Sequence, residues 1–218
     1  RDPICSVPNI VYGSKPADGG FLILSDHEKY QLLSSEPGAA PFIRPFVSAK
    51  EFINNQKRWC LWLVDVDADL LKSFPLILER VEQTKKFRLS SKKKSTVDLA
   101  KYPGLFTEIR QPQSDYLLIP RHSSESREYI PMDFFNKDFI VADSCACIPN
   151  ATLFEFGILT SAMHMAWVRN VCGRIKSDYR YSNTIVYNNF PWPLAITERR
   201  KQAIERTAQA VLDARTRF

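Results

Sequence analysis

The chain has 218 residues, of which 44% are hydrophobic and 25% charged, a balance that provides enough apolar material for one sizeable core or two small ones. No apolar run approaches the about 18 residues that a membrane-spanning helix needs, and no signal-peptide pattern opens the sequence, so we expect a soluble, cytoplasmic protein with no membrane partner. The formal net charge of +6 favours a polyanionic partner without requiring one.

The five cysteines are odd in number and scattered, and only three histidines accompany them. This pattern signals neither a disulfide framework nor a zinc site, so we expect no metal. The chain begins at Arg1 without a methionine and stops at Phe218 within an expected helix, so we expect a fragment of a longer protein.

The first third of the chain carries start signals for two short helices and one strand. Ser25 with Glu28 and Ser48 with Glu51 form capping-box patterns, each ahead of apolar residues. Residues 58–64 combine two tryptophans with aliphatic residues, which indicates a buried strand.

A long amphipathic helix is expected to begin at Pro75 and to reach about Leu89, because apolar residues recur on one side and charges fill the other. The end of this helix and the segment after it are strongly basic. Lysines interleaved with serines suit contacts to phosphate groups, although basic residues at a helix C-terminus also interact favourably with the helix dipole. The candidate phosphate-binding residues here are Lys85, Lys86, Arg88, Lys92, Lys93 and Lys94.

Three short apolar runs at residues 116–119, 129–132 and 139–142 are expected to be strands of one sheet. Residues 152–172 then become rich in Leu, Met, Ala and Trp over a length that favours one buried helix, and Thr197 can cap a final helix.

These elements predict an α+β fold with a domain boundary near residue 150. Residues 1–150 would form a mixed sheet with flanking helices, and residues 151–218 a mainly helical segment packed against it.

Reading a base edge requires arginine for guanine, glutamine or asparagine for adenine, and aspartate or glutamate for cytosine, on loops or strand ends. Residues 110–115 form such a mixture in a proline-stiffened loop, and residues 143–145 close an expected strand. Residues 121–127 form either a base-reading hairpin loop or an ordinary solvent loop. The candidate base-reading residues are Arg110, Gln111, Asp143, Cys145, Arg121, Ser123 and Ser124.

A second basic group surrounds an expected turn at Ser177 and Asp178. Arg174 and Arg180 are candidates for further phosphate contacts, whereas the tyrosines beside them fit a core position at least as well.

Several signatures of catalysis are missing from the chain. None of its seven glycines makes the GxG turn of an S-adenosylmethionine pocket, and the stretch at residues 189–193 only imitates the tetrapeptide with which adenine methylases hold the flipped base. No acidic residue is followed two positions later by lysine, as a metal-dependent nuclease would require. We therefore assign no catalytic residue and no cofactor to this piece.

Motifs spread over nearly the whole chain are similar to one family. They are residues 12–16, 18–20, 58–63, 85–95, 120–131, 157–161, 163–167, 176–182 and 188–193. Through them the chain resembles the C-terminal half of MmeI-like DNA methyltransferases, the type IIG restriction-modification enzymes.

The resemblance implies the target-recognition part of an adenine-specific DNA methyltransferase. In such a parent enzyme, an N-terminal methyltransferase domain uses S-adenosylmethionine, and the following domain recognises double-stranded DNA. The resemblance also implies that base reading occurs around Arg110 and Gln111 and around Asp143 and Cys145.

Two other kinds of function remain open from the sequence. The chain could be a basic protein-interaction scaffold without base-specific readout of DNA. It could also be an enzyme with an unrecognised site near His122 or His164, although a histidine on an apolar helix such as His164 is more often part of the core.

Overall fold

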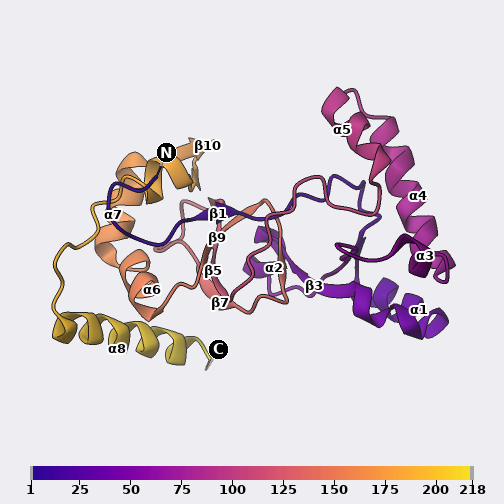
Figure 1. The fold of residues 1–218 in the computed structure, drawn as a ribbon. Coiled ribbons are helices and arrows are strands. Elements are labelled where there is room, and N and C mark those ends of the chain that lie inside the picture. Colours follow the sequence, from indigo (N-terminus) through magenta and orange to yellow (C-terminus); the bar gives the residue numbers. More distant parts are fainter. Residues whose placement is uncertain (1, 217–218) are drawn as a thin grey trace. The chain divides into compact units, whose positions relative to one another are not determined.

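A computed structural model describes residues 2–216 (Figure 1). The chain forms two compact units, each assembled from segments that are distant in the sequence. Unit 1 comprises Arg1–Tyr12, Pro112–Lys137 and Ser144–Phe218, and unit 2 comprises Gly13–Gln111 and Asp138–Asp143. The boundary predicted near residue 150 does not coincide with this division.

The sheet of unit 1 has four antiparallel strands in the order β1-β9-β5-β7. They are β1 (Val11–Tyr12), β9 (Cys145–Pro149), β5 (Tyr116–Pro120) and β7 (Asp133–Phe135). Side chains of β5 and β9 share one hydrophobic core with the helices that follow β9. This shared core explains why the chain does not divide at residue 150.

Two helices, α6 (Leu153–Leu159) and α7 (Ala162–Val171), occupy the stretch for which one helix was predicted. The prediction was wrong because Ser161 starts a new helix: its side chain accepts a hydrogen bond from the backbone N–H of His164, at 3.1 Å. A π-helical turn, η3 (Asn183–Tyr187), follows later in the chain.

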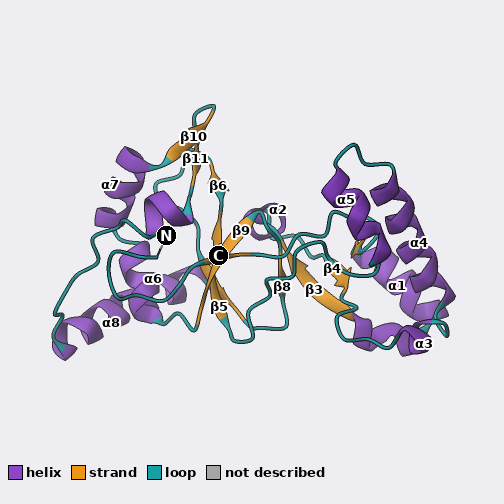
Figure 2. Cartoon of the chain, turned by 45° about the horizontal axis from the view of Figure 1, so that its top comes forward, coloured by secondary structure: helices purple, strands orange, loops and turns teal. Residues whose placement is uncertain are grey.

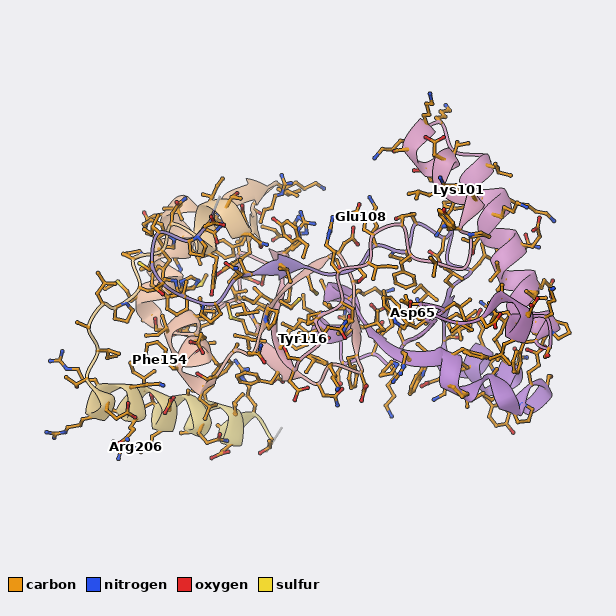
Figure 3. The ribbon with its side chains drawn as sticks, viewed as in Figure 1. Asp65, Lys101, Glu108, Tyr116, Phe154 and Arg206 are labelled. Atoms are coloured by element: carbon orange, nitrogen blue, oxygen red, sulfur yellow. The ribbon has the colours of Figure 1, made fainter. Side chains whose placement is uncertain are left out.

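The last helix, α8 (Glu198–Arg215), packs closely on α6. A Cβ atom at Gly157 of α6 would lie 2.7 Å from Cγ2 of Ile204, so the glycine permits this approach. Ala208 of α8 is buried in the same core as Phe156 and Leu159 of α6. Figure 3 labels Phe154 on α6 and Arg206 on α8.

A smaller antiparallel sheet in unit 1 has the strand order β10-β11-β6 (Figure 2). It consists of β10 (Gly173–Ile175), β11 (Asp178–Arg180) and β6 (His122–Ser123). The turn predicted at Ser177 and Asp178 therefore links two strands of a hairpin.

The sheet of unit 2 has the order β2-β4-β3-β8. Its strands are β2 (Ile23–Leu24), β4 (Trp59–Leu61), β3 (Ile43–Val47) and β8 (Ile140–Val141). The strand predicted at residues 58–64 is confirmed over its first part. The prediction that residues 139–142 share a sheet with residues 116–119 was wrong, because β8 pairs with β3 in parallel register.

The remaining regular elements of unit 2 are helices. They are α1 (Asp26–Ser35), η1 (Pro37–Phe42), α2 (Ala49–Ile53), α3 (Ala68–Leu71), α4 (Pro75–Leu89), α5 (Lys94–Asp98) and η2 (Leu99–Lys101). The capping box at Ser25 is present, and Pro75 opens α4 as predicted. The α+β class is thus confirmed, and the strands within residues 2–216 are distributed over three small sheets.

Candidate nucleic-acid interface

Two of the predicted base-reading positions meet at Ser14 in unit 2. The Ser14 hydroxyl accepts a hydrogen bond from the backbone N–H of Arg110, at 2.9 Å, and its carbonyl accepts one from the N–H of Asp143, also at 2.9 Å. Bridges between Ser14 and Ala142 and between Lys15 and Glu108 extend this contact on both sides. We call residues 13–15, 108–110 and 141–143 the Ser14 junction; Glu108 is labelled in Figure 3.

Gly13 is required for the close approach of these segments. A Cβ atom at this position would overlap the backbone carbonyl of Ala142. Because the obstacle is backbone rather than a movable side chain, no larger residue fits without displacing the segment around Ala142.

Arg110 is the most accessible of the predicted base-reading residues at the junction. Its side chain is 41% exposed and forms an ion pair with Glu108. A second guanidinium nitrogen lies 3.4 Å from the carbonyl oxygen of Gly13. The Arg110 side chain is thus held by the Glu108 carboxylate and the Gly13 carbonyl, while part of it is exposed to solvent.

Gln111 has a different environment from its neighbour. Its amide nitrogen donates to the carbonyl of Phe139 at 2.8 Å, and its amide oxygen accepts from the N–H of Val141 at 3.0 Å. In this structure the Gln111 amide therefore holds β8 in place rather than facing an external base.

Asp143 is half-buried and directly follows β8, at the junction. Cys145, predicted beside it, belongs to unit 1 and lies fully buried in β9, where it pairs with Pro120. The structure thus does not bring the Cys145 side chain to a surface where it could contact a base.

The predicted loop at residues 121–127 is partly a strand. Ser123 in β6 is buried, whereas Ser124 lies in the turn that follows, with its hydroxyl 2.9 Å from that of Ser126. The guanidinium of Arg121 lies over the ring of Tyr12, with 4.3 Å between the central carbon and the ring centroid. Of this group only Ser124 lies on the turn.

The candidate phosphate-binding residues of unit 2 are exposed, with one exception. Lys85 and Lys86 project from α4, and residues 92–94 follow a break in which the Ser91 hydroxyl accepts from the N–H of Lys93. Arg88 is the exception: it is buried, and backbone carbonyls accept hydrogen bonds from its guanidinium. The structure gives Arg88 a role other than the phosphate contact predicted for it.

Arg174 and Arg180 are exposed on the small sheet of unit 1. Arg174 stacks on Tyr179, and Arg180 pairs across the strands with His122. Burial, together with the charges of Arg121 and Arg180, lowers the pKa of His122, while Asp178 opposes the shift. Arg174 and Arg180 therefore present two positive charges on the exposed side of this sheet, which suits contact with an anion.

His164 has the properties of a core residue rather than a catalytic one. It is 1% exposed, its Nε2 atom lies 3.0 Å from the Tyr181 hydroxyl, and the ring of Phe190 packs against it edge-on. Burial lowers the pKa of His164 to about 3. The imidazole is thus neutral and inaccessible to a substrate.

The sequence predicted no separate role for Gly13 or Ser14, because residues 12–16 were noted only as one of the motifs that resemble the family. Their partners at residues 108–110 and 141–143 are distant in sequence, so no local pattern could have revealed the contact.

Among residues 2–216, no three histidine, cysteine or acidic side chains gather in a way that could hold a metal ion. The same residues contain no helix that is long and apolar enough to cross a membrane.

Comparisons with known proteins found one family model and two relatives that cover nearly the whole chain. The family model described as the MmeI target recognition domain matches residues 1–194. DNA methyltransferase A of Bacillus subtilis (strain 168) is 38% identical over 213 residues, which are 98% of this chain and 24% of that protein.

A solved structure of the type IIL restriction-modification enzyme MmeI in complex with DNA superimposes with a TM-score of 0.96. It is 44% identical and covers 100% of this chain, which spans 29% of that one. The chain thus spans less than a third of the length of either relative. The chain belongs to the MmeI target recognition domain family.

Proposed function

We propose that this chain recognises a specific double-stranded DNA sequence for an adenine-specific DNA methyltransferase of a restriction-modification system, of the type IIG class. The single observation that carries the proposal is the Ser14 junction, where Arg110 and Asp143 converge on one buried serine. Support comes from the membership in a target recognition family and from the likeness to an enzyme solved in complex with DNA.

The two side chains at the junction suit a G·C base pair. Arginine donates two hydrogen bonds to the major-groove edge of guanine, and aspartate accepts one from the amino group of cytosine. The hydrogen bonds to Ser14 fix the backbone of both residues, so their side chains start from defined positions. Restricted freedom before binding reduces the entropy lost on forming such contacts.

Affinity would come mainly from phosphate contacts by exposed cations. In unit 2 these are Lys85, Lys86, Lys92, Lys93 and Lys94, and in unit 1 they are Arg174 and Arg180. Such contacts bind any sequence and hold the duplex in register, whereas the base-edge contacts discriminate among sequences.

The methyl transfer itself would occur elsewhere in the parent protein. We propose that an N-terminal methyltransferase domain binds S-adenosylmethionine and receives the adenine that flips out of the duplex in the bacterial cytoplasm. In this division of labour, the chain described here chooses the site and contributes no catalytic group.

The proposal is tested by offering the full-length parent protein a pool of random duplexes and sequencing those that it retains at physiological salt. Enrichment of one motif is expected. Retention without enrichment, or no retention at all, would reject sequence recognition and favour a protein-interaction scaffold.

A further inference from the structure

We propose that Arg88 is a positioning residue that sets the geometry of the Ser14 junction from inside unit 2. This inference rests on the proposed function and deepens it, because it identifies a residue that controls specificity without touching DNA. The sequence had assigned Arg88 to phosphate binding, together with its lysine neighbours.

All five N–H groups of the Arg88 guanidinium donate to backbone carbonyls. Nε donates to Ala17 at 3.0 Å. Nη1 donates to Leu99 at 3.2 Å and to Tyr102 at 2.9 Å, and Nη2 donates to Pro16 at 2.9 Å and to Leu105 at 2.6 Å. The full donor capacity of the side chain is thus used within unit 2.

These carbonyls lie on two segments that continue directly into the Ser14 junction. Pro16 is next to Lys15, and Leu105 precedes Thr107 and Glu108. The two segments then bond to each other, because the N–H of Lys15 donates to Glu108 at 2.8 Å and the Thr107 hydroxyl donates to the Lys15 carbonyl at 3.0 Å. Arg88 therefore holds both segments where they approach the junction.

The local backbone also indicates that the turn after Pro16 must be held. Ala17 has a φ of 41°, in the left-handed region that residues other than glycine rarely adopt. Its carbonyl is the one that accepts from Nε of Arg88. The hydrogen bond thus contributes to fixing a conformation that the sequence does not favour by itself.

Lysine cannot replace this arrangement. The lysine ammonium presents three N–H donors on a single nitrogen. The five carbonyls around Arg88 instead accept from the five N–H donors of a planar guanidinium. Burial lowers the pKa of Arg88, and the charge of the nearby buried Asp18 opposes that shift. Lysine would keep the positive charge, so Arg88→Lys removes the planar arrangement of five donors and not the charge.

The test compares hydrogen exchange in Arg88→Lys and in wild type at three junction amides, those of Lys15, Arg110 and Asp143. Their exchange is expected to accelerate at least about tenfold, because losing charge-assisted bonds loosens the segments. The amides of Leu61 and Trp62, which bond to Leu22 and Phe42 elsewhere in unit 2, should keep their protection.

Arg80→Lys is the matched control on the same helix. Arg80 donates to the Phe21 carbonyl at 3.0 Å and to the Glu28 carboxylate at 2.7 Å, and both of these partners lie outside the Ser14 junction. It should leave the three junction amides unchanged. Equal acceleration at all unit 2 amides in Arg88→Lys, or none at the junction, would overturn the positioning role.

A wild-type measurement decides the question if Arg88→Lys fails to fold. The Nε–H and Nη–H signals of Arg88 should be resolved and should exchange as slowly as the junction amides. Exchange as fast as that of an exposed arginine such as Arg44 would refute the proposal.

The link to specificity has its own readout. In the full-length parent protein, Arg88→Lys should relax the selected motif at the position that Arg110→Ala relaxes, while Arg80→Lys should not. Loosened junction amides with an unchanged motif would contradict the effect on specificity while leaving the structural role intact. Absence of any motif in wild type would instead count against the proposed function.

Discussion

Gly13 shows how little space the Ser14 junction leaves for a side chain. Gly13→Ala should lower the free energy of unfolding by about 2 kcal/mol or more, because its Cβ would overlap the Ala142 carbonyl. Gly173→Ala is the control, since nothing lies within 4 Å of a Cβ there, and its effect should stay within about 0.5 kcal/mol. Urea unfolding of both variants measures this, and equal stabilities would contradict the close approach.

The lowered pKa of the buried His164 should make the free energy of unfolding of unit 1 depend on pH. Its folded pKa of about 3 lies below the ordinary 6.5, so the unfolded state binds the extra proton. The stabilising effect is complete above pH 6.5 and is lost as pH falls toward 3. From this group alone, stability should decrease by about 2 kcal/mol between pH 7 and pH 5.

His164→Gln tests this prediction through the change of the unfolding free energy with pH. In the variant, the decrease between pH 7 and pH 5 should be smaller by about 2 kcal/mol, whatever the substitution itself costs in stability. His122, whose pKa is also lowered, contributes in the same direction and is unchanged in the comparison. His27→Gln, at an exposed position of α1, serves as the control; equal slopes in all three proteins would contradict a neutral buried His164.

At single residues, the sequence predicted chemistry better than location. Arg110 was identified as a potential base reader and is accessible, but Arg88 has the same residue type and is buried among carbonyls. Cys145 and Ser123 were also assigned to a surface that their side chains do not reach. Residue type indicates which bonds a side chain can form, but burial depends on partners that are distant in sequence.

The end of α4 and the start of α5 form the element that should dominate non-specific affinity. Replacing Lys92, Lys93 and Lys94 together by alanine should weaken binding to all duplexes alike. The slope of log K against log salt should become less steep by about 2 to 3, since each phosphate contact contributes about 0.9.

Arg199, Arg200 and Arg206 provide the matched control for the lysine triplet. They are exposed on α8, and replacing them by alanine removes the same charge from a different helix. Titrations at several salt concentrations should show the altered slope only for the lysine variant. The same slope in both variants would show that net charge, not this segment, sets the affinity.

Elements with local start signals were predictable, whereas their pairing was not. The capping box at Ser25 and the proline at Pro75 specify helix starts through neighbouring residues. The parallel pairing of β8 with β3 joins Ile140 to Phe46, and no periodic pattern encodes such a contact. The break at Ser161 was missed because the apolar composition continues across it.

At the scale of the whole molecule, the chain passes between the two units at Tyr12, Gln111, Lys137 and Asp143. Each unit is therefore completed by residues from distant parts of the sequence. A change in composition near residue 150 suggested a boundary, but composition does not record which segments return to an earlier core. The resemblance to a known family carried the functional prediction further than the pattern of elements did.

The central claim is that Arg110 and Asp143 determine which sequence is recognised. Its most direct test is to map methylated adenines in the DNA of cells expressing the full-length parent protein, as wild type, Arg110→Ala and Asp143→Ala. Arg44→Ala and Asp69→Ala are controls at exposed positions of unit 2 outside the junction. We predict a motif relaxed at a G·C position in the first two variants and unchanged in the controls; an unchanged motif in all four would contradict the account.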